Sequence, residues 1–120
     1  MVDATGVGAP VLDAIRRERL PAMTLPVSIT SGGMPSYANG VDRIPKSDLL
    51  KRLQLLIQTE RLRIPSGTPG ARNLLDELAA YRRAPQRNGG IRFAPVDEAT
   101  NDDLLTALSL ASWAGAKVIR

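Results

Sequence analysis

The order of apolar patterns along the chain is the feature that most restricts its fold. Short stretches in which apolar and polar residues alternate recur between longer stretches that carry a helical apolar stripe. Strands are predicted at Val2 and over 25–30, 61–64 and 91–94, and helices over 10–19, from Ser47, over 74–81 and from Asn101. This order, β-α-β-α-β-α-β-α, predicts an α/β layer structure.

The clearest predicted helix follows Pro45. Ser47 is a suitable N-cap, and Leu49, Leu53 and Ile57 fall on one stripe. Residues 31–45 hold prolines and glycines without an apolar period, so a loop is predicted there. The strand at 61–64 is expected to pair with the strand at 91–94, on either side of the third helix. Residues 1–120 are expected to form one domain, with a frayed tail over 116–120.

Composition restricts the chemistry. The 120 residues include no cysteine and no histidine, which excludes disulfides, zinc sites built on those residues, and a histidine base or thiol nucleophile. Carboxylates remain, and hard cations are their natural partners. No apolar run approaches the ~20 residues of a membrane span and no signal-peptide pattern is present, so a cytoplasmic protein is expected. The net charge of +4 weakly favours a polyanionic partner, although a solvated arginine-rich face would give the same value.

Acidic residues stand at the ends of predicted elements, far apart in the sequence. Asp3 follows a strand, where α/β sheets place their ligands, although an Asx turn would also account for it. Asp102 and Asp103 stand where the last helix begins. One of them can cap that helix, while two adjacent acids repel each other and a cation would reconcile them. With Asp97 and Glu98 they could equally form a solvated acidic loop.

A glycine turn follows Asp3. The run from Gly6 to Pro10 reads Gly-Val-Gly-Ala-Pro, and a strand, such a turn and a helix could place backbone N–H groups around a phosphate. The run lacks the lysine of a P-loop, and a tight turn that needs positive φ is the alternative explanation.

Five segments of the chain resemble motifs of one protein family and follow one another in the same order as in that family. The stretch from Val2 to Val11 resembles the second acidic motif in the C-terminal nuclease domain of phage terminase large subunits. The four later segments with this resemblance are 44–50, 58–65, 74–78 and 101–111. Of these, 101–111 resembles the terminal acidic motif of that domain, although the family usually has histidine where Asn101 stands.

The resemblance implies a ribonuclease-H-like fold that cuts concatemeric viral DNA during genome packaging. It implies that Asp3 and either Asp102 or Asp103 bind two Mg²⁺ or Mn²⁺ ions. Lys46, Arg16 and Arg17 become weak candidates for contacts to the phosphates of double-stranded DNA. The implied partners are the ATPase motor, the portal of the procapsid and the small terminase subunit, in an infected or lysogenic bacterium.

The chain departs from the family in how much of the nuclease domain it is expected to contain. The family's first catalytic aspartate lies on a strand upstream of the position of Asp3, so the chain is expected to miss the first strands of the domain. We therefore expect little nuclease activity from the chain alone. Two alternatives stay open: a non-catalytic DNA- or protein-binding remnant of that domain, and a nucleotide-binding α/β domain that uses Gly6 and Gly8.

Overall fold

The computed structural model describes residues 1–6, 8–85, 91–95 and 101–118. The chain divides into two compact units, Met1–Asp48 and Leu49–Arg120. A four-stranded mixed sheet lies in the first unit, and a two-stranded sheet with most of the helical residues lies in the second. The α/β class predicted from the sequence is confirmed.

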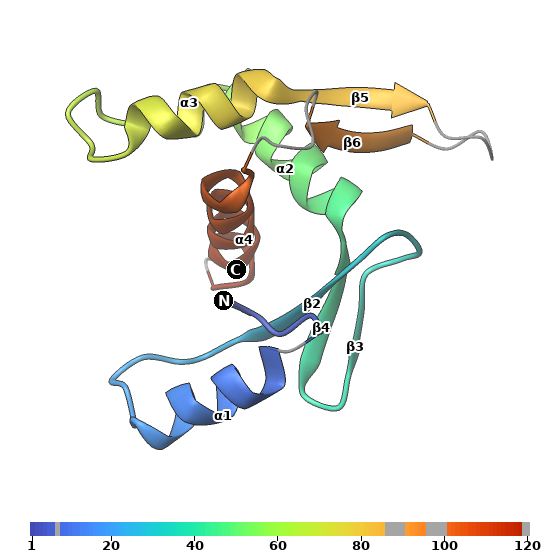
Figure 1. The fold of residues 1–120 in the computed structure, drawn as a ribbon, viewed down its shortest axis with the longest axis vertical. Coiled ribbons are helices and arrows are strands. Elements are labelled where there is room, and N and C mark those ends of the chain that lie inside the picture. The colour runs from blue at the N-terminus through green and yellow to red at the C-terminus, as the bar shows by residue number, and fades with distance from the viewer. Residues whose placement is uncertain (7, 86–90, 96–100, 119–120) are drawn as a thin grey trace. The chain divides into compact units, whose positions relative to one another are not determined.

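The first unit is a sheet with a crossover helix. Its strands lie in the order β1-β2-β4-β3, with β1, β2 and β4 parallel and β3 antiparallel to β4. Helix α1 connects the parallel strands β1 and β2 and lies alongside the sheet (Figure 1). The elements are β1 (Val2–Asp3), α1 (Gly8–Arg17), β2 (Pro26–Thr30), β3 (Ser36–Ala38) and β4 (Val41–Pro45).

Burial follows the apolar pattern of this unit. Leu12 of α1, Val27 of β2 and Ile44 of β4 are each at most 5% exposed. Asp13 of α1 is exposed, as the helical stripe predicts, whereas Val11 is 55% exposed although the sequence pattern placed it on the apolar face with Leu12 and Ile15.

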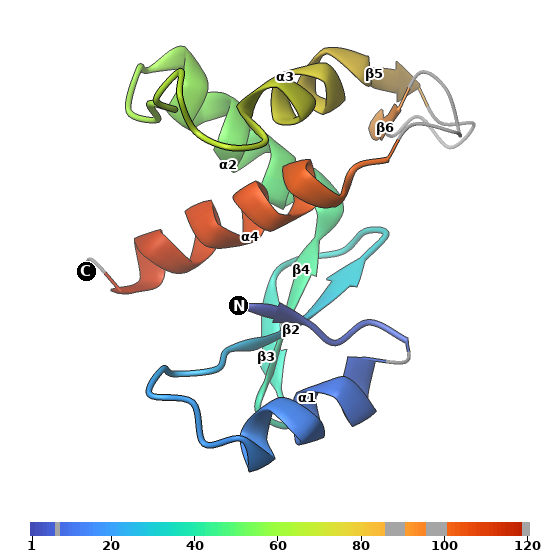
Figure 2. The same ribbon diagram turned by 60° about the vertical axis from the view of Figure 1, so that its left-hand side comes forward.

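The described residues of the second unit form helices α2, α3 and α4 and the antiparallel strands β5 and β6, and Figure 2 shows α3 leading directly into β5. Leu50 and Leu53 of α2 form the buried cluster with Leu105 of α4. Partly buried side chains pack against that cluster, among them Leu78 of α3 and Tyr81 of β5. The elements are α2 (Lys46–Gln58), which begins in the first unit, α3 (Ala71–Ala80), β5 (Tyr81–Pro85), β6 (Ile91–Pro95) and α4 (Asp103–Val118).

The predicted element order is wrong because residues 31–45 are not a loop. They contain strands β3 and β4, which form a hairpin with Ala38 opposite Val41. Asn39 and Gly40 connect the strands with φ values of 54° and 77°. Positive φ at both turn positions is the two-residue hairpin geometry that Asn-Gly favours. These residues therefore connect two strands here, although the prediction took them as a break in structure.

The strand predicted at 61–64 is also wrong. The N–H groups of Arg61 and Leu62 both donate to the carbonyl of Leu56, at 2.9 and 3.2 Å, so this segment closes the end of α2. Residues 91–95 do form the predicted strand, but they pair with β5, with Arg83 opposite Phe93. Because β5 lies closer in sequence to 91–95 than residues 61–64 do, pairing with β5 closes a shorter loop and costs less loop entropy. The run Asn88-Gly89-Gly90, whose composition is typical of a tight turn, lies outside the described residues.

Several helix ends differ from the prediction, since α1 is Gly8–Arg17 where 10–19 was expected and α3 is Ala71–Ala80 where 74–81 was expected. Helix α2 begins at Lys46, so Ser47 lies within its first turn and is not the residue before it. Helix α4 continues to Val118, so 116–118 are helical, whereas 119–120 lie outside the described residues. Lys117 in the last turn of α4 complements the negative end of the helix dipole. None of the helices that the structure describes combines the length and the apolar character needed to cross a membrane.

Candidate functional site

Asp3 ends strand β1 and is held by a local turn. The backbone N–H of Thr5 donates to Asp3 Oδ1 at 2.9 Å, and the Thr5 hydroxyl donates to the same oxygen at 2.5 Å. The N–H of Ile29 in turn donates to Thr5 Oγ1 at 2.9 Å, which ties the turn to strand β2. The Asx turn considered from the sequence is therefore present. It fixes one carboxylate oxygen and leaves Oδ2 with no described hydrogen-bond donor.

The glycines after Asp3 are explained by backbone geometry. Gly6 has φ of 63°, a value that glycine adopts at no steric cost. Gly8 is buried, and a Cβ there would lie 2.8 Å from the carbonyl oxygen of Asp3. The turn thus brings the start of α1 against the end of β1, and neither glycine needs a bound phosphate to account for it.

Asp102 and Asp103 stand at the N-terminus of α4. The carbonyl of Asp102 accepts from Thr106 N at 2.8 Å, so Asp102 occupies the N-cap position, and the Tyr81 hydroxyl donates to Asp102 Oδ2. Asp103 is the first helical residue and is exposed. The two acids therefore differ, since one is partly buried and engaged by tyrosine while the other faces solvent.

Glu77 is an acid that the sequence prediction missed. It is 9% exposed, and its Oε2 accepts from the backbone N–H of Leu105 at 2.8 Å. Leu105 is the third residue of α4, whose N–H a residue at the N-cap ordinarily satisfies. The side chain of Glu77 on α3 thus accepts the hydrogen bond from the Leu105 N–H that the side chain of an N-cap residue ordinarily accepts. The available signal was an acid on the apolar stripe formed by Leu74, Leu78 and Tyr81.

The predicted site residues belong to different units. Asp3 lies in the first unit, and Asp102 and Asp103 lie in the second. Among the residues that the structure describes, no three acidic side chains form a group that could hold a metal ion. The donors nevertheless suit magnesium or manganese, because carboxylate oxygens at element ends are the ligands that hard cations prefer. Asp97 and Glu98 lie outside the described residues.

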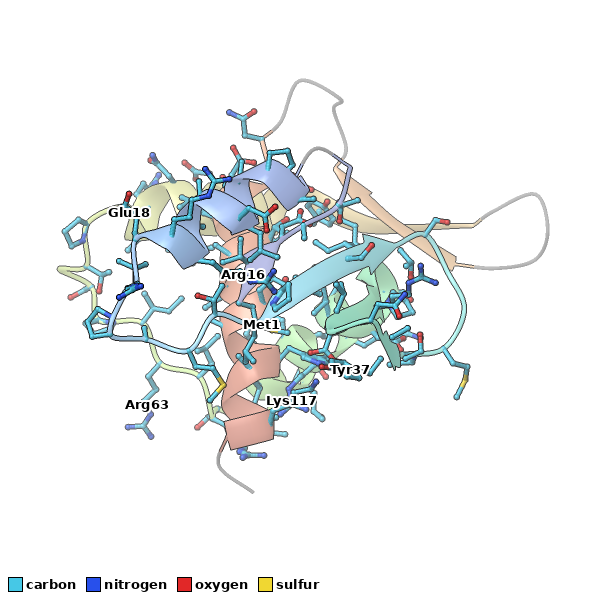
Figure 3. The ribbon with its side chains drawn as sticks, turned by 90° about the horizontal axis from the view of Figure 1, so that it is seen from below. Met1, Arg16, Glu18, Tyr37, Arg63 and Lys117 are labelled. Atoms are coloured by element: carbon cyan, nitrogen blue, oxygen red, sulfur yellow. The ribbon has the colours of Figure 1, made fainter. Side chains whose placement is uncertain are left out.

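The side chains predicted to contact phosphates differ in their exposure to solvent. Arg16 and Arg17 form the exposed last turn of α1, and Arg16 Nη1 lies 3.7 Å from Asp13 Oδ1. Lys46 is partly buried at the start of α2. Figure 3 shows the side chain of Arg63 reaching away from the ribbon. Exposed arginines such as these suit contacts to a phosphate backbone but do not identify a partner.

Comparison of the chain with protein-family models, with curated proteins and with solved structures finds no match.

Proposed function

We propose that this chain is the metal-dependent endodeoxyribonuclease portion of a phage terminase large subunit, which cuts concatemeric viral DNA in the cytoplasm of its bacterial host. The observation that carries the proposal is the carboxylate of Asp3. It lies at the carboxyl end of a parallel strand within a β-α-β unit, where α/β sheets bind ligands. Thr5 fixes Asp3 Oδ1, and Oδ2 remains available as a ligand atom.

In this proposal Asp3 is a ligand of the divalent ions, Mg²⁺ or Mn²⁺, and the family resemblance alone makes Asp102 and Asp103 the further candidate ligands. Bound there, the ions would supply hydroxide as the nucleophile and stabilise the leaving oxygen of the phosphodiester. Tyr81 orients Asp102 through its hydroxyl, and Glu77 anchors the turn of α4 that carries both acids. These contacts hold the Asp102 side chain and the first turn of α4 in position, as a preorganised set of ligands requires.

The DNA and the other partners follow from the same proposal. Arg16 and Arg17 would contact DNA phosphates without reading base sequence, and Lys46 would add to that surface. The ribonuclease-H-like fold, the ATPase motor, the portal of the procapsid and the small terminase subunit belong to the proposal as the family's further parts.

A non-catalytic, DNA-binding remnant of the same domain is the second candidate. The observation in its favour is that the Asx turn satisfies Asp3 Oδ1 and that Tyr81 engages Asp102, so both acids have structural partners without a metal. Such a remnant would bind DNA in the absence of a divalent ion, with an affinity that falls steeply as salt increases.

Manganese should stabilise the chain and should do so through Asp3. At ~100 times its Kd, a ligand adds about 2.7 kcal/mol to the free energy of unfolding, which a thermal melt detects readily. We expect Asp3→Asn to abolish the rise in Tm, and either Asp103→Asn or Asp102→Asn to do the same. Asp13→Asn and Asp76→Asn are matched controls, because these exposed acids lie on helix surfaces outside the proposed site.

A plasmid-nicking assay with manganese completes the test. Nicking that survives Asp3→Asn would contradict the nuclease proposal, as would a rise in Tm that is equal in Asp3→Asn and Asp13→Asn. DNA binding without any response to manganese would support the non-catalytic remnant instead.

A further inference from the structure

A groove lies wholly within the second unit, between α2 and α4, and the metal proposal makes no use of it. Its volume is about 530 Å³, within the range of about 300–1,000 Å³ typical of ligand sites. Leu56, Leu62 and Leu108 give it an apolar lining. Leu62 and Leu108 also pack against the buried cluster, so the lining is continuous with the core of this unit.

From Ala111 onward, the wall formed by α4 consists of small residues. Ala111 and Gly115 are one helical turn apart, and Ala116 follows them. Apart from its chain neighbours and the backbone of its own helix, nothing lies within 4 Å of the position that a Cβ on Gly115 would take. The backbone of α4 is therefore open to close approach along this wall, as a groove that receives another helix requires.

Two arginines give the groove its charge. The Arg52 Nε donates to the carbonyl of Ser112 at 3.1 Å, and the Arg52 guanidinium lies 6.0 Å from the centre of the Trp113 ring. These contacts hold Arg52 in place, while Arg61 is exposed. No acidic side chain of the described residues pairs with either guanidinium. The groove thus combines an apolar lining with positive charge that its surroundings do not neutralise.

We propose that this groove is a docking site for an acidic amphipathic helix of another protein. Leucine-type side chains of that helix fill the space over Leu56, Leu62 and Leu108, and its glutamates or aspartates pair with Arg52 and Arg61. Charge complementarity selects an acidic partner. Duplex DNA suits the groove less well, because its phosphates require a row of cations and gain nothing from a leucine lining. The site goes beyond the proposed nuclease function and does not depend on it.

The test is binding of a synthetic helical peptide to the whole chain. The peptide is about 16 residues long, since shorter isolated helices are marginal in water, and carries leucines on one face with glutamates beside them. Binding is measured by the anisotropy of a label on the peptide and by the emission of Trp113, the single tryptophan. Trp113 reports on the groove because Arg52 contacts both its ring and the main chain of α4.

Two variants should lower the affinity of the chain for the peptide by at least about tenfold, which corresponds to ~1.4 kcal/mol of binding free energy. Gly115→Leu adds a side chain at the groove in a helical position where an added Cβ meets nothing outside its own helix, so the variant should still fold. Arg61→Glu reverses an exposed charge at the groove. Arg63→Glu is the matched control, because Arg63 is exposed and lies outside the lining, and it should change the affinity less than about twofold.

The same experiment can overturn the proposal. Equal binding of a peptide with lysines in place of the glutamates would do so, as would unchanged affinity in Gly115→Leu. A DNA duplex that displaces the peptide and loses affinity in Gly115→Leu would assign the groove to nucleic acid instead. Binding that leaves the emission of Trp113 unchanged would place the peptide elsewhere.

Discussion

Replacement of Leu53 by alanine is expected to lower the free energy of unfolding by about 2–5 kcal/mol, the usual range for a fully buried leucine. Leu53 is 2% exposed and belongs to the cluster in which α2 meets α4. Removing its side chain leaves a cavity beside Leu50 and Leu105 that the rigid helices fill only in part. Chemical denaturation measured by circular dichroism gives the change directly.

Leu55→Ala is the matched control for this prediction. It removes the same atoms from the same helix, but Leu55 is 57% exposed, so we expect a change within about 0.5 kcal/mol. Equal losses in the two variants would show that α2 does not bury the face that the structure assigns to it.

Replacement of Glu77 by leucine is expected to cost about 1.5–3 kcal/mol, because the N–H of Leu105 loses a charged hydrogen-bond partner. Glu77→Gln keeps the shape and one carbonyl acceptor, so its loss should be smaller. Hydrogen exchange at the Leu105 amide reports on the same bond and should accelerate most in the leucine variant.

Asp76→Asn serves as the control for Glu77. Asp76 is the adjacent acid on α3, and its exposed pair with Arg72, at 3.6 Å, is worth only about 0–1 kcal/mol. If Asp76→Asn and Glu77→Leu had equal effects on stability, or if exchange at Leu105 stayed unchanged in both, Glu77 would have no role in anchoring α4.

The elements that the sequence predicted well are those with a strong apolar period. The periods predicted over 10–19, from Ser47 and over 25–30 correspond to α1, α2 and β2, in which Leu12, Leu53 and Val27 are buried. The errors have two causes. Asn39-Gly40 is the turn of a hairpin and not a break in structure. The alternation at 61–64 belongs to a segment that closes the end of α2 and does not form a strand.

The candidate site was predictable only in part. Asp3, Asp102 and Asp103 stand out because they are acids at the ends of elements, and the structure gives each such a position. Glu77 and Tyr81 were missed as partners of α4, since their contacts join residues 28 and 21 positions apart, and such pairs depend on tertiary packing. Single-sequence patterns describe neighbours along one element and do not report which elements meet.

The central claim of the nuclease proposal is that Asp3 binds a divalent cation. Paramagnetic broadening by substoichiometric Mn²⁺ tests it most directly, with the amide signals of Thr5 and Gly6, beside Asp3, compared with those of the control acids Asp13 and Asp76. The claim predicts that Thr5 and Gly6 broaden first and that Asp3→Asn abolishes their broadening. Equal broadening at all four residues, or broadening at Thr5 and Gly6 that persists in Asp3→Asn, would contradict it.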